Sequence, residues 1–147
     1  MMLAASPPLS SAPVKCVPNL AICTGRGLTA VFAVFMFGAS IAPKLLGLDV
    51  AGDTLATLGW RADAALPIGL VELGCLLLYL WPRTSILGAV LTTALLGGAM
   101  ASQTRVGAPL FSHTLFGVYL GLVMWGGLWL RDPALRAIYP WRRDNRG

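Results

Sequence analysis

One acidic residue, Glu72, lies inside a stretch of sequence that is otherwise apolar. It follows Ala65, the first residue of that stretch, by seven positions, which corresponds to a depth of roughly 10 Å in an α-helix. A charged side chain near the middle of a bilayer costs about 2.5–3.5 kcal/mol on insertion scales. We therefore expect Glu72 to face the protein interior with a charged partner or a bound proton. An arginine beside Glu72 would keep it ionised, whereas burial alone would favour a protonated acid that donates hydrogen bonds or shuttles a proton.

Four further polar residues are expected at the same end of the molecule as Glu72. Lys44 follows the first apolar stretch, Gln103 and Arg105 follow the third, and His113 begins the fourth. Helices that alternate in direction bring all four residues to one side of a membrane. Together with Glu72 they form our candidate ligand-binding site. A buried ion pair of Glu72 with a lysine or arginine that only fixes the register of the helices is an equally good interpretation.

These residues depend for their positions on helices that the composition predicts. Hydrophobic residues make up 56% of the chain and charged residues 12%, whereas soluble domains are about a quarter charged. Four apolar stretches have lengths suited to crossing roughly 30 Å of hydrocarbon as α-helices. They cover about residues 27–45, 65–81, 85–102 and 111–130. The predicted fold class is therefore all-α, a four-helix transmembrane bundle.

The remaining sequence divides the chain into a domain and two tails. Residues 1–25 contain four prolines among serine and alanine, which predicts a disordered tail, and residues 141–147 form a basic C-terminal tail. The domain between them, 26–140, contains a polar connection of about twenty residues, 45–64, that we expect to be a loop. The first apolar stretch also resembles a signal peptide, but Pro43 after the cleavage-like residues favours a retained helix.

Basic residues are unevenly distributed along the chain. Eight of the eleven Lys and Arg residues fall on the side of the predicted spans that carries both termini, and three fall on the other side. Because cytoplasmic segments collect positive charge, we expect both termini in the cytoplasm. The basic residues stand singly or near the C-terminus rather than on one helix face, which argues against nucleic-acid binding.

The cysteines and histidine do not suggest a metal or a cofactor. Cys16, Cys23 and Cys75 show no C-x-x-C spacing and have no histidine cluster beside them, so we expect neither a metal site nor a disulfide framework. No haem ligand set, iron–sulfur motif or flavin motif can be identified, so we expect no cofactor.

Small residues four positions apart indicate where membrane helices approach closely. Two such pairs lie in the middle of predicted spans, Ala94 with Gly98 and Gly117 with Gly121. We expect helix packing at both pairs.

Several short motifs occur in a characteristic order. They are Pro43-Lys44-Leu45-Leu46-Gly47, Leu58-Gly59-Trp60, Gly69-Leu70-Val71-Glu72-Leu73-Gly74, Pro82-Arg83-Thr84, Arg105-Val106-Gly107 and Leu130-Arg131-Asp132-Pro133. In this order and spacing they resemble the DoxX-like family of small bacterial membrane proteins, over about Gly27 to Pro140. The resemblance implies a four-helix bundle in the bacterial inner membrane, with relatives that associate with thiosulfate:quinone oxidoreduction or other membrane redox complexes. Many relatives have a histidine where this chain has Gln103, and glutamine cannot relay protons near neutral pH.

Three functions are compatible with these residues and with the resemblance. The first is an accessory subunit of a membrane redox system, whose site around Glu72, Arg105, Lys44, Gln103 and His113 binds a quinone-like or other amphipathic small molecule. The second is a quinone-linked oxidoreductase subunit that uses a partner protein's redox centre. The third is a small transporter, which one acid among four short helices supports least unless the protein forms homo-oligomers. Whether the protein is an enzyme stays open, and the expected partners are the lipid bilayer, a membrane redox protein and further copies of the chain.

Overall fold

The computed structural model describes residues 20–138, apart from the side chain of Ala62, and contains helices and turns with no strand in that range. The prediction of an all-α protein is confirmed for this part of the chain. The elements are α1 (Leu20–Met36), the π-helical η1 (Phe37–Ile41), α2 (Ala42–Leu45), α3 (Asp49–Thr57), the 3₁₀-helical η2 (Ala62–Ala64), α4 (Ala65–Leu80), α5 (Ser85–Arg105), the π-helical η3 (Leu110–Thr114), α6 (Phe116–Arg131) and α7 (Pro133–Ile138).

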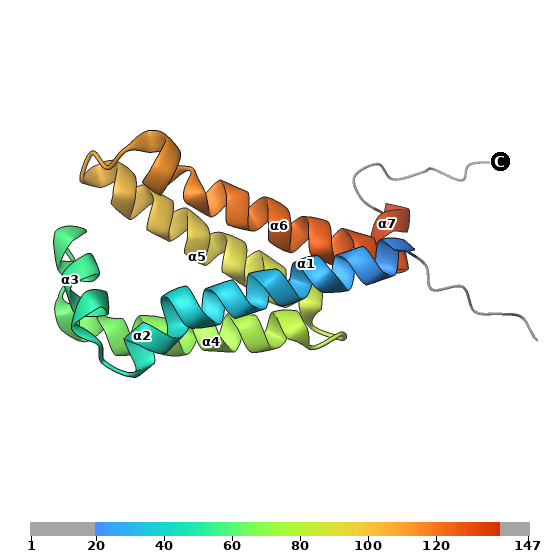
Figure 1. Cartoon of the computed structure of the whole chain (residues 1–147), viewed down its shortest axis with the longest axis horizontal. Coiled ribbons are helices and arrows are strands. Elements are labelled where there is room, and N and C mark those ends of the chain that lie inside the picture. Colours follow the sequence, from blue (N-terminus) through green and yellow to red (C-terminus); the bar gives the residue numbers. More distant parts are fainter. Residues whose placement is uncertain (1–19, 139–147) are drawn as a thin grey trace, which may run out of the picture.

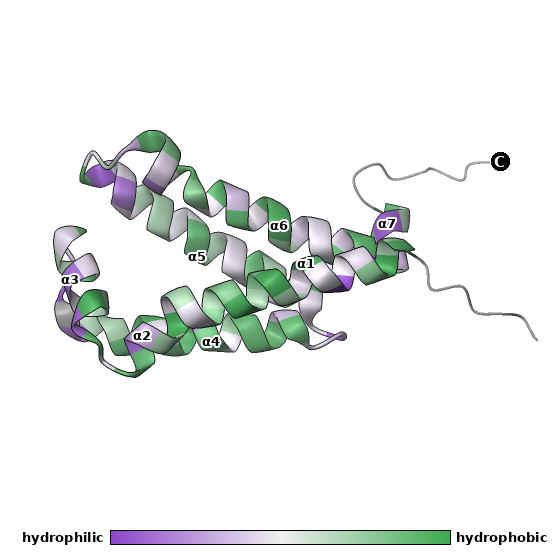
Figure 2. Cartoon of the chain, in the orientation of Figure 1, coloured by the Kyte–Doolittle hydropathy of each residue, from purple (hydrophilic) through white to green (hydrophobic). Residues whose placement is uncertain are grey.

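Three helical segments within residues 20–138 are long and apolar enough to cross a membrane. They are Leu20–Leu45, Ser85–Arg105 and Leu110–Arg131, with 26, 21 and 22 residues. α4 is apolar as well but has 16 residues, or about 24 Å of helix. Figure 2 shows hydrophobic residues along the long helices and the more hydrophilic ones near their ends. This distribution is that of a helical membrane protein.

The first helix begins earlier than the sequence indicates. α1 starts at Leu20, so that the last residues of the predicted tail 1–25 are helical. The physical reason is packing, since Gly25 is buried where α1 crosses α6, and a Cβ atom on it would lie 2.8 Å from the Gly127 carbonyl oxygen. The other residues of the predicted N-terminal tail, 1–19, and the basic tail, 141–147, lie outside the described residues.

The long helices pack together at one end and separate into two arms at the other (Figure 1). α1 packs along α6, and α4 packs along α5. Toward the far end, η1 and α2 stay with α4 in the first arm, whereas η3 stays with α5 in the second arm. We call the end near α7 and the α4–α5 turn the closed half, and the end near α3 the open half.

Glycines allow the close contacts of the closed half. A Cβ atom on Gly88 of α5 would overlap the backbone of α4 at Leu78 and Tyr79. Gly25 and Gly127 allow the same close approach between α1 and α6. Without a hydrophobic force between helices in lipid, such backbone approach is a main source of helix association.

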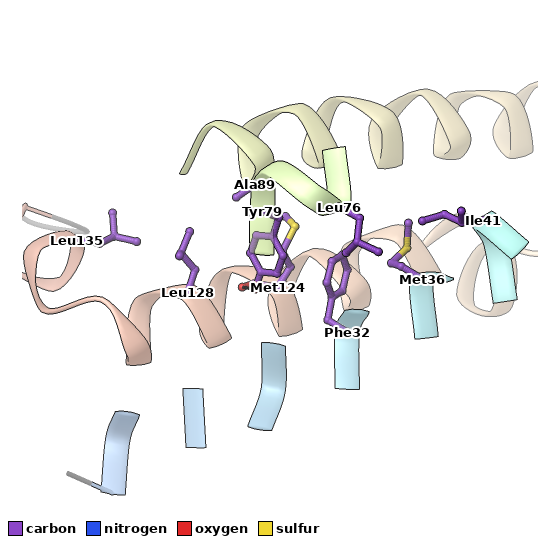
Figure 3. Close-up of a cluster of buried hydrophobic side chains, with 9 residues drawn as sticks. All are labelled: Phe32, Met36, Ile41, Leu76, Tyr79, Ala89, Met124, Leu128 and Leu135. Carbon is purple, nitrogen blue, oxygen red and sulfur yellow. Dashed lines mark hydrogen bonds between the residues drawn. The ribbon is translucent and has the colours of Figure 1, made fainter. Parts of the chain in front are cut away.

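A cluster of buried side chains surrounds Tyr79 in the closed half and extends to Ile41 in the first arm (Figure 3). The Tyr79 ring meets Phe32 edge-on, with centroids 5.4 Å apart. Its hydroxyl donates a hydrogen bond to the Met124 carbonyl oxygen at 2.9 Å. The Arg131 guanidinium donates to the Tyr79 carbonyl oxygen at 2.9 Å and lies over the Tyr79 ring. Tyr79 thereby links α4 to both α1 and α6.

The predicted small-residue pairs are only partly used. A Cβ atom on Gly117 would lie 2.8 Å from Met100, so this glycine does allow η3–α6 to approach α5. A Cβ atom on Gly98 or Gly121, however, would have no neighbouring part of the described chain within 4 Å. The expectation of close packing at Gly98 and Gly121 is therefore wrong, because these glycines face open space.

The polar connection 45–64, expected to be a loop, contains α3. Gly47 ends the preceding helix with φ +64°, and Asp49 lies in the first turn of α3, where a carboxylate interacts favourably with the helix dipole. Two residues of α3, Ala51 and Leu55, have buried side chains. This burial stabilises a helix whose glycine, aspartate and threonine content favours a loop.

Candidate functional site

A cavity of about 700 Å³ lies between the two arms in the open half. We call it the outer cavity. Both arms and α3 contribute to its wall. The lining residues include Ser40 and Lys44, several from Val50 on α3 to Leu58 at its end, several from Ile68 to Cys75 on α4 and from Leu91 to Gln103 on α5, and His113 with Phe116. Most of these side chains are apolar. The polar ones lie on both arms and on α3.

Glu72 and Lys44 form an ion pair in the wall of the outer cavity. The Lys44 ammonium donates to both carboxylate oxygens of Glu72, at 3.0 and 2.9 Å. Ser40 completes the group, because its hydroxyl donates to Glu72 at 3.0 Å and accepts a hydrogen bond from Lys44 at 2.6 Å. The side chains of Lys44 and Glu72 are 15% and 13% exposed. Glu72 thus has the charged partner that its depth requires, and that partner is Lys44.

The geometry of this group follows from local features of the first arm. Pro43 has no backbone N–H, so it cannot bond the carbonyl oxygen four residues earlier, and the helix widens into the π-helical η1 just before it. Ser40 and Lys44 stand four residues apart and meet at their side chains. Gly69 lets α2 come close to α4, since a Cβ atom on it would lie 2.9 Å from the Lys44 Cβ.

Arg105 lies at the end of α3 rather than beside Glu72. Its guanidinium does not line the outer cavity but donates a hydrogen bond to the Leu58 carbonyl oxygen at 2.6 Å. Leu58 is the C-cap of α3, and a cation at a helix C-terminus is favourable for the helix dipole. Gly59, with φ +75°, leaves room for the guanidinium, because a Cβ atom there would lie 2.9 Å from it. The next residue, Trp60, donates from its indole to the Ser102 hydroxyl at 3.2 Å.

Gln103 and His113 line the outer cavity without touching the ion pair. Across residues 20–138, no hydrogen bond engages the Gln103 side chain, so its amide is available to a ligand as both donor and acceptor. The His113 ring shares a hydrogen bond of 2.8 Å with Ser112 and is exposed. Of the five candidate residues, the structure therefore brings Lys44 and Glu72 into contact, places Gln103 and His113 on the same cavity, and turns Arg105 toward α3.

Two residues of the site were not predicted. Ser40 precedes Lys44 by four positions, and that helical spacing is the signal that would have included it. Trp60 stands in a recognised motif, but only the position of α3 reveals that it reaches Ser102.

The site offers hydrogen bonds and compensated charge within an apolar wall. No three His, Cys, Asp or Glu side chains of the described chain are grouped so that they could hold a metal ion. The positive charge of Lys44 and the negative charge of Glu72 cancel, which leaves little demand for a charged ligand. A ligand with an uncharged polar head and an apolar body fits this environment.

Comparison with known families agrees with these features. The sequence profile of the DoxX-like family matches residues 27–127. No curated protein and no solved structure matches the chain. Four of the motifs that indicated this family now have structural roles. Leu58-Gly59-Trp60 meets the end of α5 through Arg105 and Ser102, and Gly69 makes room for Lys44 beside Glu72.

Proposed function

The chain belongs to the DoxX-like family, and on that premise we propose that it binds an uncharged, amphipathic, quinone-like small molecule in the outer cavity. The observation that carries the proposal is an apolar cavity of about 700 Å³ with one compensated ion pair in its wall. Cavities of roughly 300–1,000 Å³ with few, well-placed polar groups are typical of small-molecule sites.

The polar groups indicate how the head of such a ligand is held. Ser40, Lys44 and Glu72 lie on the first arm, and the Gln103 amide lies on the second. A quinone has two carbonyl oxygens on opposite sides of its ring, so one oxygen faces each arm. Its tail, which is soluble in lipid, extends along apolar side chains such as Val71 and Leu91. The side chains of Val71 and Leu91 are 54% and 38% exposed, which leaves apolar surface for such a tail.

The membrane topology is part of the proposal. We take Leu20–Leu45, α4, α5 and Leu110–Arg131 as four spans in the inner membrane of a bacterium, with both termini in the cytoplasm. The eight Lys and Arg residues on the side of the termini, against three on the other side, support this orientation. The open half then faces away from the cytoplasm.

The role that we assign is accessory. Oxidising or reducing a quinone needs a redox centre, and we propose that a partner protein in the membrane provides it. The chain would hold the quinone, or a molecule like it, and present it to that partner. Copurification of a flavoprotein or a sulfur-transfer protein would support this role.

Mass spectrometry of copurifying small molecules tests the binding proposal. Wild-type protein is solubilised in mild detergent beside a Glu72→Gln variant, which leaves Lys44 without its counter-charge. The matched control is Tyr79→Phe, which removes a hydroxyl from the closed half. We expect a quinone or a lipid-like molecule with the wild type and the control and much less of it with Glu72→Gln. Equal amounts in all three folded proteins, or no ligand in any of them, would overturn the proposal and identify the ion pair as scaffold.

A further inference from the structure

α3 covers the outer cavity at the end farthest from the closed half (Figure 1). Its inner face, with Val50, Thr54 and Leu55, forms part of the cavity wall. Its outer face, with Asp53 and Thr57, is exposed. A ligand that enters or leaves through this end of the molecule must pass α3.

The backbone on either side of α3 allows the helix to move relative to the first arm. Gly47 before the helix and Gly59 after it both have positive φ, at +64° and +75°, a conformation that glycine adopts freely and other residues adopt rarely. Short segments that absorb changes of φ and ψ are typical hinges of moving elements. The two glycines therefore delimit a unit that can rotate as a whole.

Two hydrogen bonds hold the end of α3 to the second arm. The Arg105 guanidinium donates to the Leu58 carbonyl oxygen, and the Trp60 indole donates to the Ser102 hydroxyl. Both bonds are exposed, so water can replace them when they break. Leu58 directly follows α3, whereas Trp60 lies just past Gly59, so α5 is attached to both sides of this hinge at one edge of the cavity.

From these observations we infer that α3 is a lid on the outer cavity and that Arg105 is its latch, with Trp60 anchoring the Gly59 hinge to α5 beside it. The inference rests on the proposed function, because a lid matters where a ligand passes. Release of the Arg105–Leu58 bond lets α3 turn about its glycine ends and opens the cavity between the arms. Arg105 thus acts on the site through α3, as a positioning residue, and not through contact with the ligand.

The native thiol of Cys75 reports on this opening. Cys75 lines the outer cavity below Glu72 and is 6% exposed, so a water-soluble reagent reaches it slowly while the lid is shut. The experiment uses the full chain with Cys16 and Cys23 replaced by serine, in intact bacterial cells. The probe is a membrane-impermeant methanethiosulfonate, and the measurement is the initial rate at which Cys75 is labelled.

Three variants are compared with this parent. Arg105→Gln removes the latch to Leu58, and Trp60→Phe removes only the indole hydrogen bond. Arg61→Gln is the matched control, because Arg61 is an exposed arginine at the same end whose ion pair is with Asp63. We expect labelling of Cys75 to be several-fold faster in Arg105→Gln, faster to a smaller extent in Trp60→Phe, and unchanged in Arg61→Gln.

The lid is refuted if Arg105→Gln labels at the parental rate, or if Arg61→Gln accelerates labelling as much. If Arg105→Gln does not accumulate as folded protein, Trp60→Phe decides, and an unchanged rate in it refutes the latch. The labelling needs no ligand. If labelling refutes the lid, the mass spectrometry of copurifying ligands still tests the proposed function. If no ligand copurifies, the labelling rates still test whether α3 moves.

Discussion

The closed and open halves are made from the same apolar helices, yet the helices touch in the closed half and enclose the outer cavity of about 700 Å³ in the open half. In the closed half, helix backbones touch at Gly25, Gly88 and Gly127, and Tyr79 bonds to its neighbours. In the open half, the close contacts fall within each arm. Gly69 joins α2 to α4, and Gly117 joins the start of α6 to α5. Between the arms, Gly59 lies beside the Arg105 side chain and not against a helix backbone. The glycines thus bring helix backbones together in the closed half and leave the arms apart in the open half.

Polar groups follow the same division. In the closed half, the Tyr79 hydroxyl bonds to the protein itself, at the Met124 carbonyl oxygen. The open half exposes an ion pair and the Gln103 amide to the cavity. The closed half is therefore the scaffold that holds the two arms in position, and the open half is the part that we propose binds the ligand. Each prediction below tests one side of this division.

The largest effect is expected for Gly88→Ala in the closed half. The added Cβ atom overlaps the α4 backbone, and backbone cannot move aside as a flexible side chain can. We expect a loss of about 3 kcal/mol or more of stability, or no folded protein. Gly98→Ala on the same helix meets open space and should not lower stability, and the better helix propensity of alanine favours a gain of up to about 1 kcal/mol. Thermal unfolding in detergent, followed by size-exclusion chromatography, measures both, and equal losses would contradict the division.

The ion pair provides the next largest effect. Glu72→Leu or Lys44→Met alone leaves an unpaired charge in an apolar wall, and we expect each to cost about 2–3 kcal/mol, below the range for fully buried pairs because both side chains are partly exposed. The double variant Lys44→Met with Glu72→Leu removes both charges and should recover most of that stability without recovering ligand. Thermal unfolding and mass spectrometry of bound molecules are measured on the same samples. A double variant that is stable and still carries ligand would show that ligand binding does not depend on the ion pair.

A smaller effect is expected for Gly69→Ala, which pushes α2 away from α4. The new Cβ atom meets the Lys44 Cβ at 2.9 Å, so the first arm must shift by a fraction of an ångström. We expect a loss of about 1–2 kcal/mol and weaker ligand retention, because Lys44 no longer reaches Glu72 well. Gly74→Ala, on the same helix but with nothing nearby, is the matched control. Alanine is the better helix former, so the control should lose no stability. A loss as large in the control would mean that the contact with Lys44 is not responsible.

The smallest effect is expected for Tyr79→Phe. The variant keeps the ring in the core but loses the hydrogen bonds of the hydroxyl to Met124 and Thr29. We expect about 1 kcal/mol of lost stability with unchanged ligand content. Tyr119→Phe, which alters an exposed tyrosine, should leave both quantities unchanged. Loss of ligand from Tyr79→Phe in a folded protein would mean that the closed half takes part in binding.

The sequence predicted the helices and the acid better than it predicted the contacts. An acid within an apolar stretch must find a partner, which is why Glu72 and the polar end of the molecule could be predicted. The choice of Lys44 over Arg105 depends on the π-helical turn before Pro43 and on the room at Gly69, neither of which is visible in residue spacing.

The position of Arg105 could not be predicted because α3 was not expected. Aspartate, threonine and glycine in 49–57 favour a loop, and the burial of Leu55 that makes the segment helical is a tertiary effect. Once α3 is present, its C-terminal carbonyl oxygen attracts Arg105. The packing glycines were missed for a similar reason, since Gly25, Gly88 and Gly127 show their use only when partner helices are in place.

Photochemical cross-linking with a short-chain quinone that carries a photoreactive group would test binding in the open half most directly. The wild-type protein is reconstituted in lipid nanodiscs, irradiated and digested, and adducts are located by peptide mass spectrometry. We expect adducts within 68–75 and 91–103 that an excess of unlabelled quinone suppresses, and none within 76–89 of the closed half. Adducts that resist competition, or that are as frequent in 76–89, would contradict a quinone-like ligand in the outer cavity.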